Sequence, residues 1–224
     1  MKKSFLPLSS LSQKYITALA GIFLMLFLVF HLATNLLMLT GDGEAFQRAV
    51  TFLTENPVVK IMEYFLFAGF LIHIILGFLL QIQNYTSRPV KYHKRLKTET
   101  STFSRFMFHT GVIILIFLVI HLVNFFFVRL GWAPIPGEAG EVADKHDFYS
   151  MAQLWFKNPW YSLIYLVSFV FLGFHLKHAF QSAFQSLGLN HTKYTPVIKV
   201  IGTIYAIAIS AGFAIIPVYF YFFH

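Results

Sequence analysis

Five long apolar stretches, separated by polar or charged segments, set the pattern of this sequence. At about 1.5 Å of rise per residue, each stretch is long enough to cross the roughly 30 Å hydrocarbon core of a bilayer as a helix. Asn56-Pro57 and Asn158-Pro159 open two of the stretches as N-cap and N1 pairs, and Gly188 closes the second of these two. The pattern predicts an all-α integral membrane protein, a single domain over residues 1–224 with transmembrane helices at 14–40, 57–85, 105–130, 159–187 and 195–223.

Composition and charge placement agree with a chain that crosses a membrane several times. Hydrophobic residues make up 57% of the chain and charged residues only 12%, which is far from an ordinary soluble domain. The net charge of +8 does not indicate nucleic acid, because the basic residues gather at alternate helix ends. Lys2, Lys3 and the segment 88–105 are basic, whereas the segments 41–56 and 129–158 carry most of the acids. The positive-inside rule then predicts an inside N-terminus and an outside C-terminus, and the first apolar stretch is expected to be a retained span.

Four histidines lie deep inside the predicted helices: His31, His73, His121 and His175. An imidazole in hydrocarbon is costly and is usually kept for a function. His73 and His175 each follow the proline that opens their helix by sixteen residues, or about 24 Å, which places both in the inner half of the membrane. His31 and His121 share a His-Leu pattern followed shortly by Asn and are expected in the outer half.

Two depth-matched histidine pairs are what two six-coordinate haems require. We predict that His31 and His121, on helices one and three, ligate the iron of an outer haem. His73 and His175, on helices two and four, would ligate the iron of an inner haem, so that four helices surround two stacked haems. The chain has no cysteine, which excludes covalent haem attachment and cysteine-ligated iron–sulfur clusters, so both haems would be of the b type. Two protein ligands per iron leave no open position and favour electron transfer.

Other readings of the histidines stay open. Each could be a separate core imidazole bonded to backbone carbonyls, or they could form a proton relay in a haem-free transporter. His109 competes with His121 as the ligand on the third helix, and His178 lies one turn from His175. A cytochrome b anchor of a formate dehydrogenase or hydrogenase, or a ferric reductase, is a further alternative. Those proteins often place two histidines thirteen or fourteen residues apart on one helix, which this sequence does not do.

The order and spacing of these motifs resemble the di-haem cytochrome b membrane-anchor subunit of succinate:quinone oxidoreductases and fumarate reductases, in its single-chain, five-helix form. The resemblance covers nearly the whole chain and rests on FHLATN, IHIILG, VIHLVN and FHLKHAFQSAFQSLG, on Thr110-Gly111 and on Gly188. It implies a respiratory-chain subunit of succinate dehydrogenase, a tricarboxylic acid cycle enzyme, or of fumarate reductase. Such a subunit is a multi-pass protein of the bacterial inner membrane.

The resemblance also implies partners. It implies an FAD-containing flavoprotein and an iron–sulfur subunit docked on the inner face, since nothing in this chain could bind FAD or a cluster. The quinone implied is menaquinone, the lipid bilayer surrounds the helices, and the complex could form oligomers. Some relatives carry a glutamate two residues before the fourth ligand, where this chain has Gly173, so a carboxylate path for protons through helices four and five is in doubt.

Polar residues near the predicted haems are candidates for lesser roles. Glu63 is the only acid well inside a predicted helix; it could transfer protons at an outer quinone site, or it could form an interfacial ion pair with Lys60, one turn away. Arg129, at the outer end of helix three, would then be free to bind outer-haem propionates. On the inner side, the propionate partners are predicted to be Ser12, Gln13, Lys14 and His178.

Overall fold

The computed structural model describes residues 9–41, 43–86, 106–138 and 141–223. Within these ranges all regular structure is helical, and five helices are long and apolar enough to cross a membrane. These spans are Ser10–Leu39, Pro57–Thr86, Met107–Arg129, Pro159–Ser186 and Thr195–Phe223. The prediction of an all-α chain with five membrane-length helices is confirmed. The basic segment 88–105, with Lys2 and Lys3, lies outside the described residues.

The signals that predicted the helix ends act as expected in most cases. The Asn56 side chain accepts a hydrogen bond from the Val58 amide at 2.9 Å and so caps α3 (Pro57–Thr86). Asn158 does the same for α7 (Pro159–Ser186), accepting from the Trp160 amide at 3.0 Å. Gly188 follows α7 with φ +84°, a left-handed conformation that favours glycine. The predicted start of the first helix at residue 14 is wrong.

The first helix starts one turn earlier because a serine caps it. The Ser9 side chain accepts from the Ser12 amide at 3.1 Å, so α1 spans Ser10–Leu36 and continues as a 3₁₀ turn over Leu37–Leu39. The fifth span, α8 (Thr195–Phe223), has the predicted bounds and contains Pro217.

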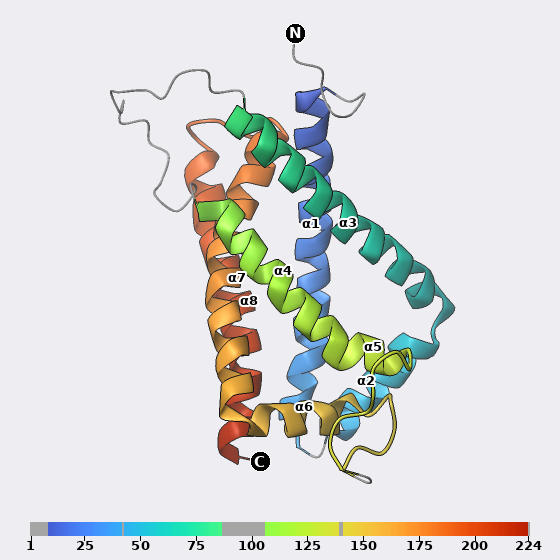
Figure 1. Ribbon diagram of the computed structural model, residues 1–224. Coiled ribbons are helices and arrows are strands. Elements are labelled where there is room, and N and C mark those ends of the chain that lie inside the picture. The colour runs from blue at the N-terminus through green and yellow to red at the C-terminus, as the bar shows by residue number, and fades with distance from the viewer. Residues whose placement is uncertain (1–8, 42, 87–105, 139–140, 224) are drawn as a thin grey trace.

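Two short amphipathic helices occupy segments that the sequence treated only as polar loops. They are α2 (Glu44–Glu55) and α6 (Phe148–Lys157), and both lie at the end of the bundle where the C-terminus lies (Figure 1). Gly43 begins α2 with φ +82°, and an added Cβ there would overlap the ring of Tyr149 from α6. The Tyr149 hydroxyl also donates to the Gly41 carbonyl at 3.2 Å. The two helices therefore form one cap over this end.

The spanning helices pack around a core between α1, α7 and α8, while α3 and α4 (Met107–His121) run obliquely across the bundle (Figure 1). Small residues allow close approach. A Cβ added at Gly212 of α8 would lie 2.7 Å from Leu32, and one added at Gly202 would lie 2.8 Å from Phe180. Large apolar side chains cover the outward faces, with Phe30 72% exposed. Such a surface suits a lipid environment, and with five membrane-length helices the chain is a multi-pass membrane protein.

The third span is not a continuous α-helix. Directly after His121 the backbone forms a π-helical turn over Leu122–Phe126 and then returns to the α form as α5 (Phe127–Arg129). Such turns widen a helix locally and often occur at functional sites. The turn therefore changes the direction in which the residues beyond His121 point.

The first four spans repeat one arrangement of motifs and helices. In each half, a glycine stands ten residues before a histidine on the first span, Gly21 before His31 and Gly111 before His121. A short surface helix follows, α2 in one half and α6 in the other, and an Asn-Pro pair then opens the second span. We call α1–α2–α3 and α4–α6–α7 the two halves; α8 belongs to neither.

Candidate functional site

The outer histidines lie beside one another between two spans. The ring centroids of His31, on α1, and His121, at the end of α4, are 5.8 Å apart with an interplanar angle of 81°. Phe27 stacks on His31 at 5.1 Å and Phe117 on His121 at 6.0 Å. Each imidazole is thus supported by an aromatic ring one turn before it on its own helix. The Asn35 amide nitrogen donates to the His31 carbonyl at 2.7 Å and lies 3.3 Å from His31 Nδ1.

The inner histidines form a second pair. The ring centroids of His73, on α3, and His175, on α7, are 6.4 Å apart with an interplanar angle of 78°. Both rings lie against glycine on the first span of their own half. A Cβ added at Gly21 would lie 3.4 Å from His73 Cε1, and one added at Gly111 would lie 3.4 Å from His175 Cε1. A larger residue at either position would push the imidazole away from its partner.

Thr110 lies beside one of these rings. Its hydroxyl donates to the Met107 carbonyl at 2.9 Å and lies 3.3 Å from His175 Nδ1. With the hydroxyl hydrogen used in this way, the second contact is a hydrogen bond in the His175 tautomer that carries its proton on Nδ1. The lone pair of His175 is then on Nε2, the atom that is left to bind a metal.

The ring centroids lie 5.8 Å apart in the outer pair and 6.4 Å apart in the inner pair, with the two rings edge to face in both. The Nδ1 atom of His121 is buried without a hydrogen-bond partner, which is costly unless something further engages the ring. Among the described residues, no group of three or more His, Cys, Asp or Glu side chains could hold a metal ion.

The two competing histidines lie elsewhere. His109 is exposed and its ring lies beside Phe106 and Phe108, at 5.8 and 6.1 Å. His178 is partly buried on α7. His31 contacts the ring of His121, whereas the two ring contacts of His109 are both with phenylalanine.

The predicted propionate partners near the N-terminus have other contacts in the structure. Gln13 is fully buried and accepts a hydrogen bond at 3.0 Å from Gln83 on α3. Ser12 lies in the cap of α1, where its hydroxyl is 2.9 Å from that of Ser9. Lys14 is exposed. Gln13 therefore joins α1 to α3 through a buried polar contact.

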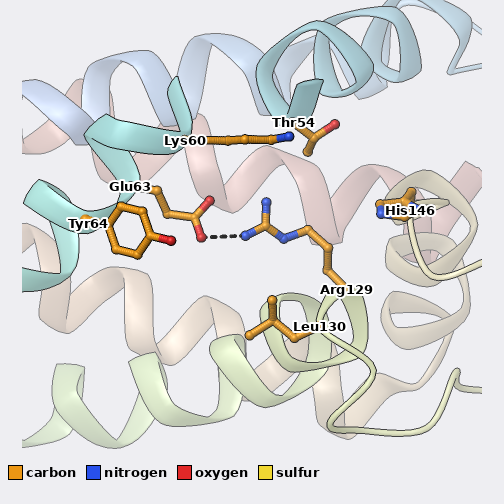
Figure 2. A pocket seen from close by; sticks show the side chains of 7 residues that line it. All are labelled: Thr54, Lys60, Glu63, Tyr64, Arg129, Leu130 and His146. Carbon is orange, nitrogen blue, oxygen red and sulfur yellow. Dashed lines mark hydrogen bonds and ion pairs between the residues drawn. The ribbon is translucent and has the colours of Figure 1, made fainter. Parts of the chain in front are cut away.

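Glu63 forms an ion pair across the bundle. Its carboxylate accepts a hydrogen bond at 2.6 Å from Arg129, and the two side chains are only 30% and 18% exposed. The Arg129 guanidinium also lies 4.8 Å from the ring centroid of Phe126. The prediction that Glu63 would pair with Lys60 is wrong, and so is the premise that Arg129 is free. Lys60 is exposed, and Figure 2 shows its side chain directed toward Thr54.

The ion pair lies in a cavity of about 330 Å³ at the same end of the bundle as α2 and α6 (Figure 2). The cavity is lined by Thr54, Lys60, Glu63, Tyr64, Arg129, Leu130 and His146. It therefore brings together a carboxylate, a guanidinium, a phenol and an imidazole. The sequence gave no signal that His146, Thr54, Tyr64 or Leu130 belongs to a site. Thr54, Leu130 and His146 reach the cavity only because segments other than α3 pack against it, and the local sequence does not reveal such packing.

A second polar cluster lies beside His121, in the π-helical turn and on α6 and α7. Asn124 and Tyr165 are buried, with 8% and 3% exposure. The side chains of Asn124 and Tyr161 interact with the Tyr165 hydroxyl, and the indole nitrogen of Trp155 is buried without a hydrogen-bond partner. In the sequence these residues, apart from Asn124 in its His-Leu motif, were read only as parts of apolar helices or of the loop.

Gly173 lies against the last helix. A Cβ added there would be 3.0 Å from the Ser210 hydroxyl oxygen and 3.9 Å from the Ala206 carbonyl oxygen of α8. A side chain at this position would therefore require Ser210 to move.

Comparison of the chain with models of protein families, with curated proteins and with solved structures finds no match.

Proposed function

We propose that the chain is the membrane-anchor cytochrome b subunit of a succinate dehydrogenase or fumarate reductase complex. The observation that carries the proposal is the presence of two histidine pairs, at 5.8 and 6.4 Å, inside membrane-spanning helices. His31 and His121 would hold an outer b haem, and His73 and His175 an inner one. When bound, the two haems would carry single electrons between the two membrane faces.

Other residues of the chain would serve this function by positioning the imidazole rings of the four histidines. Gly21 and Gly111 leave the space that the inner imidazoles occupy, and the Thr110 hydroxyl lies 3.3 Å from His175 Nδ1. Phe27 and Phe117 fix the planes of the outer imidazoles by stacking. Rigid support of this kind keeps ligand geometry constant, which electron transfer requires.

The membrane orientation and the partners belong to the same proposal. The N-terminus would lie inside and the C-terminus outside in a bacterial inner membrane, because the basic residues flank one set of helix ends. A flavoprotein with FAD and an iron–sulfur subunit would dock on the inner face and perform the succinate chemistry. Electrons would then pass between that face and menaquinone at the outer one.

The cavity around Glu63 and Arg129 is the proposed quinone site. A quinone needs a group that binds its carbonyl oxygen and a group that exchanges protons, because its reduction takes up protons as well as electrons. The guanidinium can do the first and the carboxylate the second, and the two lie 2.6 Å apart in one cavity. Lys60 is at the edge of this region and is not paired with Glu63, and Tyr64, 79% exposed, lies where a lipid-soluble substrate would enter.

The test is a reduced-minus-oxidised spectrum with haem quantitation on the full chain, expressed with its partner subunits. We expect two low-spin b haems per chain. His73→Ala or His175→Ala should remove the inner haem, and His31→Ala or His121→Ala the outer one. His109→Ala is the matched control and should retain both. Purified wild-type protein without haem would refute the proposal.

The quinone site is tested separately. Glu63→Gln keeps the shape of the side chain but cannot exchange protons, so quinone turnover should fall by a factor of about 10² or more. Haem content and spectra should be unchanged. Full turnover in this variant would remove Glu63 from the mechanism, whereas loss of haem would show that its role is structural.

A further inference from the structure

His146 lines the cavity of the Glu63–Arg129 ion pair from the loop directly before α6. Its side chain is 47% exposed, whereas the two members of the ion pair are 30% and 18% exposed. In Figure 2, His146 and Tyr64 lie on opposite sides of the ion pair. The imidazole therefore stands where the cavity meets water, on the side away from Tyr64.

His146 is held in this position by contacts with two segments. Its carbonyl accepts a hydrogen bond from the Gln47 amide of α2 at 3.3 Å, and its own amide donates to the Asp144 carboxylate. The same carboxylate oxygen lies 3.4 Å from His146 Nδ1. Because a carboxylate only accepts hydrogen bonds, it favours a proton on Nδ1 and leaves Nε2 to take up and release another.

Four charged groups lie around the imidazole on the elements that form the cavity. They are Lys60 and Glu63 of α3, Arg129 of α5 and Asp144 of the loop, whereas the contact with α2 is through the uncharged Gln47. Glu63 is paired with Arg129, and Asp144 lies beside His146. Because Asp144 is 66% exposed, water stabilises its charge when the ring is neutral. The ring can therefore gain or lose a proton without stranding a buried charge.

Quinone chemistry at Glu63 needs a route for protons. Reduction of a quinone takes up two electrons and two protons, and oxidation of the quinol releases them, while the electrons would pass to or from the outer haem. Glu63 is mostly buried, so a further group must deliver or remove its proton between steps. The cavity of about 330 Å³ has room for several waters at roughly 30 Å³ each. An imidazole is the side chain that exchanges protons most readily near neutral pH.

We propose that His146, held by Asp144, passes protons between Glu63 and the water at the capped end of the bundle. This inference rests on the proposed function, because it requires quinone chemistry at Glu63. In quinol oxidation, Glu63 takes the proton of a quinol hydroxyl and the electron passes to the outer haem. The proton then moves through cavity water to His146 Nε2, and the ring releases it to bulk water. Quinone reduction runs the same steps in reverse.

The first test measures turnover of a menaquinone analogue by the complete complex. His146→Gln keeps a polar side chain that cannot carry a proton, so turnover should fall about 10-fold. This loss is smaller than that expected for Glu63→Gln, because cavity water still conducts protons slowly. Imidazole added to the buffer should restore the turnover. His191→Gln is the matched control and should change nothing, because this exposed histidine lies in the loop between α7 and α8.

The second test separates a proton role from a structural one. In Asp144→Asn, the side-chain oxygen can still accept from the His146 amide, but the charge beside the ring is lost, so the ring holds a proton only at lower pH. The pH profile of turnover should therefore move to lower pH. The direction is the same for oxidation, which needs a neutral ring to accept a proton, and for reduction, which needs a charged ring to donate one.

Haem content and spectra are recorded for each variant and should match those of the wild type. Full turnover in His146→Gln would overturn the inference. A loss that imidazole does not restore, together with an unmoved pH profile in Asp144→Asn, would do the same by showing a structural role. In both cases an inactive Glu63→Gln variant would leave the quinone site standing. A wild-type complex without quinone turnover would instead overturn the proposed function.

Discussion

The ion pair between Glu63 and Arg129 should stabilise the fold measurably. Fully exposed ion pairs contribute about 0–1 kcal/mol, and removing one partner of a fully buried pair costs about 3–5 kcal/mol. With side chains 30% and 18% exposed, this pair falls between these limits. We expect Glu63→Gln to cost about 1–2 kcal/mol. Arg129→Met should cost about 2–3 kcal/mol, because it also removes the contact with Phe126.

A double-mutant cycle measures the pair directly. The free energy of unfolding is followed in mixed detergent micelles for each single variant and for the double variant. Because the two changes remove the same interaction, the double variant should lose about 1–2 kcal/mol less than the two single variants together. Lys60→Met is the matched control and should cost below about 0.5 kcal/mol. A coupling energy below about 0.5 kcal/mol between Glu63 and Arg129 would refute the reasoning.

The other predictions concern the spans. Gly111→Leu should displace the His175 ring and lower inner-haem content, whereas Gly77→Leu should not, because an added Cβ at Gly77 meets nothing within 4 Å; pyridine haemochrome assays of both variants decide this. Exchange of the exposed His109 for Gln should leave the electron paramagnetic resonance spectrum of the haems unchanged, and a new low-spin signal would contradict the ligand assignment. Gly173→Glu should reduce the yield of folded protein in size-exclusion chromatography by forcing α8 outward, and a stable, fully expressed variant would show that α8 can move.

The membrane spans follow from the sequence because their signals are local. Length, apolarity and the Asn-Pro pairs determine where α3 and α7 start, and the spacing from each proline to the next histidine is a property of one helix. Residues at equal depth on neighbouring helices can therefore be matched before any packing is known. The rings of His73 and His175 do lie side by side, while ligation of iron by them stays a prediction.

What the sequence did not reveal depends on contacts between distant segments or on weak local signals. The partner of Glu63 stands sixty-six residues away, so a nearby lysine was the natural but wrong choice. The helices α2 and α6 have only 12 and 10 residues. The few apolar residues of so short an amphipathic helix are hard to tell from those of a polar loop. Tyr165 gave no signal because a tyrosine in an apolar helix usually belongs to the core.

The two halves described above carry a consequence for how the chain arose. Each membrane histidine lies beside the histidine at the same position of the other half, His31 beside His121 and His73 beside His175. Equivalent residues meet each other only along a two-fold axis. A gene duplication that fused two copies of a helical hairpin would place both histidine pairs on the axis of the former homodimer. Six residues after the opening proline, one copy now has Glu63 and the other Tyr165. Such a fusion would let these equivalent positions differ, one in a charged cavity and the other among aromatic rings, which identical subunits could not do.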